Sequence, residues 1–173
     1  MLGFQGLKEM INAHPLFTHF PLALLPASAL FYLLGALFKK NGLSEAGRWT
    51  LWFGTLAAAL AVWTGFRAAG TVEHNEEVHA IMTLHQNLSY VVLGLGALLS
   101  GWVLAVRRAA PQKGGGIFLA LLIMLAFALA QQADLGGRMV FAYGTGVGRK
   151  SMAPKHVHNP NVHHSHEETE LVH

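Results

Sequence analysis

The residues of this chain that are best suited to chemistry are its histidines. The sequence has 11 histidines and no cysteine. Imidazole is a ligand for iron, copper and zinc. The lack of cysteine excludes structural disulfides, thiolate metal sites and the covalent attachment of c-type haem. Metal chemistry in this chain would therefore depend on histidine, methionine or carboxylate side chains.

Three of the histidines stand where long apolar runs begin. His14 and His19 lie in the stretch AHPLFTHFPLALLP (13–26), and His85 opens the cluster HQN (85–87). Polar side chains at membrane depth are rare and often functional. A histidine at a membrane surface can also sit half in water without any ligand. Both interpretations stay open at the level of single residues.

Composition and hydropathy predict the elements that must position these histidines. The chain is 53% hydrophobic and 12% charged, with a mean hydropathy of +0.39. Apolar segments at 16–38, 49–70, 81–106 and 117–130 reach, with their flanks, the roughly 20 residues that cross a bilayer. We expect an all-α fold: a four-helix transmembrane bundle over 1–135, then a Gly-rich irregular outer loop and a His-rich extramembrane tail over 136–173. We find no internal repeat in the sequence.

Positive charges indicate the orientation. The first connection carries Lys39, Lys40 and Arg48, and the third carries Arg107, Arg108 and Lys113. Short basic loops favour the cytoplasmic side. We therefore expect a multi-pass protein of the bacterial cytoplasmic membrane with both termini and all histidines on the periplasmic side. The basic residues after the fourth segment oppose this orientation but are outnumbered. Nucleic-acid binding is excluded, because Lys and Arg fall mainly in these short loops.

The depth of the histidines predicts a cofactor site. In an up-down bundle the first and third helices are parallel and diagonal. A rise of about 1.5 Å per residue places His19 roughly 7 to 8 Å deeper than His14, and His85 roughly 9 Å deeper than His79. We expect two layers, His14 with His79 and His19 with His85. Of these, His19 and His85 are the favoured axial ligands of a b-type haem, and His14 and His79 are candidates for a second cofactor.

Arginines near the same side would complete such a site. Arg67 and Arg138 follow the second and fourth apolar segments. Guanidinium groups pair well with carboxylates, so these two residues are candidates to neutralise haem propionates.

The C-terminal tail is a separate candidate. Residues 155–173 are polar and hold histidines in H-x-H and H-H-x-H arrays. Such tracts bind copper or zinc with modest specificity. The candidate metal ligands are His156, His158, His163, His164 and His166.

Three short motifs resemble those of the bacterial membrane family called domain of unknown function 2231, over about residues 10–150. The matching residues are His14, Pro15, His19, Phe20 and Pro21, then His85, then Gly136, Gly137, Val140, Tyr143, Gly144, Gly146 and Val147. The chain departs from the pattern at Thr145 and in its tail. The resemblance implies four spans and, by analogy with relatives suspected to be b-type cytochromes, bound haem.

Together these observations favour a b-type cytochrome-like electron-transfer subunit of a membrane redox complex, with one or two haems. It would be a non-catalytic carrier rather than an enzyme with its own substrate. Its expected partners are the lipid bilayer, other subunits of that complex and an external cytochrome c. Two alternatives remain: a periplasm-facing copper or zinc binder, and a structural subunit without a cofactor.

Overall fold

The computed structural model describes residues 12–72 and 75–146, and these residues form helices joined by short connections. The helices are α2 (His14–Phe38), α3 (Asn41–Ala69), α4 (Glu76–Val106) and α5 (Gly115–Phe141). Each is long and apolar enough to cross a membrane. The predicted all-α class and the four membrane spans are therefore confirmed.

The last helix is longer than the sequence indicated. A loop was expected from residue 136, because paired glycines are poor helix formers. In the structure α5 continues through Gly136 and Gly137 to Phe141. Since Gly136 lies against the His85 ring of α4, tertiary packing outweighs the weak local preference.

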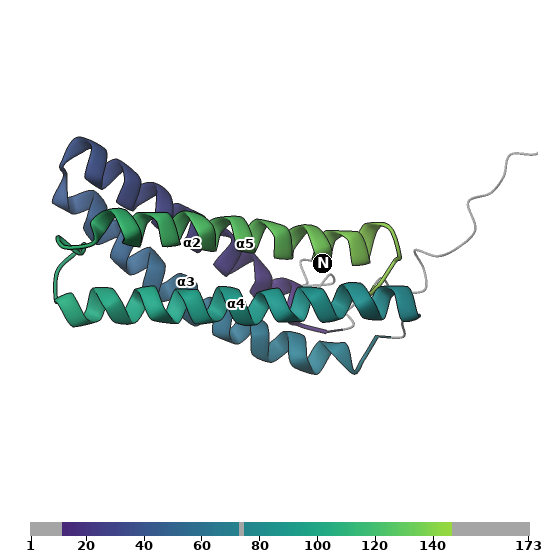
Figure 1. The fold of residues 1–173 in the computed structure, drawn as a ribbon. Coiled ribbons are helices and arrows are strands. Elements are labelled where there is room, and N and C mark those ends of the chain that lie inside the picture. Colours follow the sequence, from purple (N-terminus) through teal and green to yellow (C-terminus); the bar gives the residue numbers. More distant parts are fainter. Residues whose placement is uncertain (1–11, 73–74, 147–173) are drawn as a thin grey trace, which may run out of the picture.

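The helices form a ring in the order α2, α3, α4, α5. Helix α2 packs against α3 and α5, and α4 packs against the same two neighbours. This confirms the expected up-down bundle in which α2 and α4 are diagonal. In Figure 1 the α2–α3 and α4–α5 connections lie at one end of the bundle and the α3–α4 connection lies at the other.

We name the two ends by their residues. The basic end carries the connections with Lys39, Lys40, Arg107, Arg108 and Lys113. The histidine end is the opposite one, where α2 begins at His14, α4 begins at Glu76, and α3 and α5 end.

A single cluster of apolar side chains fills the bundle. Leu51, Leu99 and Leu122 are fully buried, and the rings of Tyr32 and Phe118 meet edge to face with centroids 4.9 Å apart. Inside a bilayer such contacts hold helices together by close packing rather than by exclusion of water.

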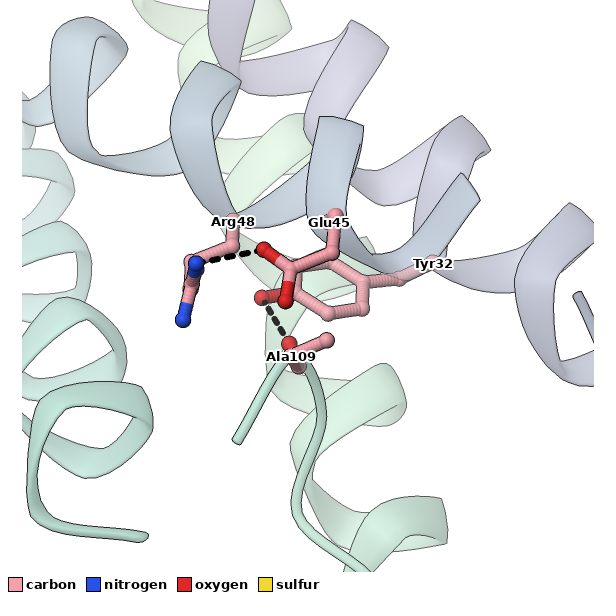
Figure 2. Close-up of polar contacts among 4 residues, drawn as sticks. All are labelled: Tyr32, Glu45, Arg48 and Ala109. Carbon is pink, nitrogen blue, oxygen red and sulfur yellow. Dashed lines mark hydrogen bonds and ion pairs between the residues drawn. The ribbon is translucent and has the colours of Figure 1, made fainter. Parts of the chain in front are cut away.

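The basic end is also tied by polar contacts (Figure 2). The Tyr32 hydroxyl of α2 donates a hydrogen bond of 2.9 Å to the carbonyl of Ala109, in the α4–α5 connection. Beside it, Arg48 forms an ion pair with Glu45 on α3. The Tyr32 bond therefore joins the two helical hairpins at this end.

The outer surface of the bundle is apolar. Large side chains face outward on every helix, among them Leu37 (68% exposed) and Phe127 (65% exposed). A water-soluble monomer rarely exposes so much contiguous apolar surface. These faces are suited to lipid, in agreement with the four spans.

Candidate functional site

Two half-buried histidines lie inside the histidine end. They are His14 on α2 and His85 on α4, whereas His19 and His79 are exposed. The rings of His14 and His85 are close enough to interact electrostatically. The two imidazoles come from diagonal helices, and the His14 ring lies against α3 whereas the His85 ring lies against α5.

The hydrogen bond of His85 fixes which ring nitrogen is free. Its Nδ1 lies 2.8 Å from the backbone carbonyl oxygen of Gln132 on α5. A carbonyl oxygen only accepts hydrogen bonds, so Nδ1 carries the proton and donates. The lone pair of a neutral ring then resides on Nε2, the atom that remains available to a ligand.

His14 is held in an equivalent way by Thr64 of α3. The Thr64 hydroxyl donates to the carbonyls of Leu60 (3.0 Å) and Ala61 (3.1 Å). With its single proton directed to these carbonyls, the hydroxyl accepts the 3.2 Å bond from His14 Nδ1. His14 therefore also presents the lone pair of Nε2.

Glycines on the neighbouring helices make room for both rings. A Cβ atom on Gly65 of α3 would lie 2.9 Å from Cε1 of His14. A Cβ atom on Gly136 of α5 would lie 3.3 Å from Cε1 of His85. An alanine at Gly65 would require the His14 ring to shift, and one at Gly136 would require the His85 ring to give way by a few tenths of an ångström, so both glycines allow the rings their present positions.

This arrangement is suited to axial ligation of a metal. Metal-bound histidines usually donate their second N–H to a carbonyl or another oxygen, which fixes the ring and raises its basicity. Thr64 and Gln132 supply such acceptors. Neutral imidazoles with one free ring nitrogen are the type of ligand that haem iron accepts.

The structure selects a different inward-facing pair from the one expected. The sequence favoured His19 with His85, but His19 is exposed, whereas His14 and His85 are both half-buried. Five residues turn a helix by about 140°, so His14 and His19 cannot both face the core. The expected layers also shift, because about two and a half turns of α4 precede His85 whereas His14 begins α2.

The two candidate arginines lie at the histidine end. Arg67 is in the last turn of α3, and Arg138 is in the last turn of α5. Both are exposed. Arg67 lies over the Trp63 ring, 5.5 Å from its centroid, and Arg138 lies next to Tyr143.

Several contributing residues were missed by sequence reasoning. They are Thr64, Gly65, Gln132 and the pair Tyr143 and Glu77. The Tyr143 hydroxyl donates a 2.7 Å hydrogen bond to Glu77, joining the segment after α5 to the first turn of α4. The sequence did contain signals for the glycines: Gly136 belongs to the third family motif, and each glycine stands two residues before an arginine, in GFR (65–67) and GGR (136–138).

The metal ligands expected in the tail are not among the residues that the structure describes. They are His156, His158, His163, His164 and His166. Within the part of the chain that the structure describes, no group of three or more His, Asp or Glu side chains could hold a metal ion. The inward pair of imidazoles is therefore the candidate site of the described bundle.

Comparison with known protein families identifies the family of this chain. A family model described as "Predicted membrane protein (DUF2231)" matches residues 10–149. The chain belongs to this family. The DUF2231 match includes all four helices and both inward histidines, which confirms the resemblance seen in the short motifs. No curated protein and no solved structure matches the chain.

Proposed function

We propose that this DUF2231 protein binds one b-type haem between His14 and His85 and serves as an electron carrier of the membrane. The observation that carries the proposal is the pair of Nδ1 hydrogen bonds, to Thr64 and Gln132, which leaves two Nε2 lone pairs on diagonal helices. Because the chain has no cysteine, the haem would be held by axial ligation and packing alone.

The chain's own residues have distinct roles in this proposal. His14 and His85 are the axial ligands, while Thr64 and the Gln132 carbonyl orient them. Arg67 and Arg138 stand at the same end to pair with propionates. Bound haem supplies a one-electron redox couple. The surrounding apolar helices exclude water from it, and low polarity is one determinant of a haem potential.

The proposed setting is the bacterial cytoplasmic membrane with the histidine end on the periplasmic side. The charged connections at the basic end favour this orientation. A haem near the periplasmic surface would be within reach of an external cytochrome c, and the apolar outer faces would contact lipid and other subunits of a redox complex. The tail histidines remain candidates for binding copper or zinc.

The experiment is a reduced-minus-oxidised visible spectrum of the detergent-purified full chain, expressed with added haem precursor, together with a pyridine haemochrome assay. We expect the b-type signal in the wild type. We expect it to disappear in His14→Ala and in His85→Ala, and to persist in the exposed-histidine controls His19→Ala and His79→Ala.

The other outcomes are equally informative. A colourless wild type would contradict the cytochrome proposal. Loss of haem in His19→Ala with retention in His14→Ala would restore the pair that the sequence favoured. Copper or zinc that is removed by deleting the tail, from a colourless protein, would support the metal-binding alternative.

A further inference from the structure

The burial pattern of the bundle repeats along the chain. In the first and third helices the buried positions Pro21, Leu25, Ser28 and Tyr32 correspond to Val92, Gly96, Leu99 and Val103. Each pair is separated by 71 residues (92 − 21 = 71, 103 − 32 = 71). The side chains differ within most pairs, which is why the repeat is not visible in the sequence.

The second and fourth helices repeat with the same offset. Buried positions Gly47, Leu51, Gly54, Ala58 and Thr64 of α3 correspond to Phe118, Leu122, Leu125, Leu129 and Leu135 of α5. The offset is again 71 residues (118 − 47 = 71). The hairpin α2–α3 and the hairpin α4–α5 therefore share these buried positions, although α2 and α3 pack together more extensively than α4 and α5.

The ring order gives these hairpins a symmetry. Helices α2 and α4 both begin at the histidine end, and each packs against both α3 and α5. Exchanging the hairpins therefore preserves every neighbour relation in the ring. In topology this corresponds to a pseudo-two-fold axis along the length of the bundle.

The candidate site obeys the repeat. His14 and His85 are 71 residues apart (85 − 14 = 71), as are Gly65 and Gly136 (136 − 65 = 71). The contacts are equivalent too, because each imidazole places its Cε1 over the glycine of the next helix. Arg67 and Arg138 also obey the offset (138 − 67 = 71).

We infer that the histidine end is a two-fold site made of two equivalent half-sites, in which Gly65 and Gly136 are the positioning residues for the two axial imidazoles. This inference rests on the proposed haem function and deepens it. A ligand on such an axis must offer the same groups to both hairpins. Each hairpin would receive one coordination position for its histidine and one anionic group for its arginine.

Apart from the positions of its vinyl and methyl groups, haem b has the two-fold symmetry that this site requires. A two-fold axis in the plane of the porphyrin, running between its two propionates, exchanges the two faces and also exchanges the propionates. Haem held on the bundle axis would be ligated by His14 from one hairpin and by His85 from the other. Arg67 and Arg138, one from each hairpin, would be available to pair with its two propionates.

The test substitutes each positioning glycine in the full chain. We expect Gly65→Ala and Gly136→Ala each to weaken haem retention about tenfold, as is typical when the support of a metal ligand is altered. Gly94→Ala and Gly101→Ala are matched controls on α4, where an added Cβ meets no atom within 4 Å. Size-exclusion chromatography and far-ultraviolet circular dichroism verify that every variant is folded.

A second pair of variants avoids any effect on packing. Arg67→Gln and Arg138→Gln alter exposed side chains, and the symmetry predicts that both shift the haem midpoint potential in the same direction and by a similar amount. Arg108→Gln, exposed at the basic end, is the control and should leave the potential unchanged.

The outcomes separate this inference from the proposed function. A wild type that binds haem, with glycine variants that retain it as Gly94→Ala does, would overturn the two-fold site and leave the cytochrome proposal intact. A response to only one glycine or only one arginine would overturn the equivalence of the halves. A colourless wild type would overturn both proposals.

Discussion

Two hydrogen bonds determine which ring nitrogen of each inward histidine is available to a ligand. The abundance of histidine in the sequence does not determine this. Threonine in a helix commonly bonds back to its own backbone, and Thr64 does so through its only proton. That bond converts the hydroxyl into an acceptor for His14, in the way that the Gln132 carbonyl is an acceptor for His85. The carbonyl fixes the tautomer of His85, and Thr64 favours the same tautomer of His14 when its proton stays on its own backbone.

The Thr64 hydroxyl can be tested by itself. Thr64→Val keeps the shape of the side chain and removes the acceptor of the His14 proton, so we expect haem retention to fall about tenfold. Thr50→Val is the matched control on the same helix, because Thr50 makes the same backbone bonds, to Ala46 and Gly47, at the basic end. Equal haem titrations for the two variants would contradict the role of Thr64.

Between elements, glycines determine how closely the helices of one hairpin approach. On α3 a Cβ atom at Gly47 would lie 2.9 Å from the Tyr32 ring of α2, and one at Gly54 would lie 2.8 Å from Leu25. Small residues at such contacts let membrane helices pack closely. The α2–α3 hairpin therefore holds the first half-site as one unit.

Gly47→Ala tests this contact. The added methyl group must displace the Tyr32 ring, and overpacking of this kind costs about 1–3 kcal/mol. Gly42→Ala on the same helix meets no atom within 4 Å, so it should be neutral or slightly stabilising. Unfolding in mixed detergent micelles measures both, and a Gly47→Ala protein as stable as Gly42→Ala would exclude the close approach.

The segment after α5 is joined to α4 by the bond from Tyr143 to Glu77. This bond, together with partial desolvation and the negative charge of Glu77, raises the pKa of Tyr143 above its ordinary value of about 10. Folding thus favours the protonated phenol. The contact stabilises the fold at pH values below about 10 and is lost as the pH rises through the raised pKa.

We expect Glu77→Gln to bring the pKa of Tyr143 back towards its ordinary value, because the neighbouring charge is removed. Titration of tyrosinate ultraviolet absorbance measures the change, and a Tyr143→Phe protein identifies which part of the signal is Tyr143. Glu76→Gln removes the adjacent exposed acid and should leave the titration as in the wild type. An unchanged titration in Glu77→Gln would show that this contact does not form in solution.

The whole molecule is polarised, with imidazoles at one end and cationic connections at the other. The positive-inside rule predicts that the basic end faces the cytoplasm. Since the chain has no cysteine, single cysteines can report this directly. Gly70 at the histidine end and Gln112 at the basic end are both exposed.

We expect a membrane-impermeant maleimide to label Gly70→Cys in spheroplasts and to label Gln112→Cys only after permeabilisation. The reagent cannot cross the bilayer, so labelling identifies the side directly. The reverse pattern would invert the orientation, and with it the choice of a periplasmic electron partner, while leaving the bundle unchanged.

The sequence by itself determined the all-α fold class, the four membrane spans, and the separation of histidines and basic connections to opposite ends of the bundle. Lipid leaves backbone groups no partner except within a helix, so every span must appear as a long apolar run. Short connections then make neighbouring helices antiparallel, which placed His14, His19, His79 and His85 at one end. These features follow from composition and spacing along the chain.

Tertiary structure decided which histidines face each other. Contacts with neighbouring helices determine how a helix is rotated about its own axis and at which depth in the bundle it begins. The hydrophobic pattern gives little guidance here, because the outward faces are as apolar as the core. The contacts of Gly65 and Gly136 turned His14 inward with His85 and left His19 outside, and the two-fold repeat became visible only as a pattern of burial.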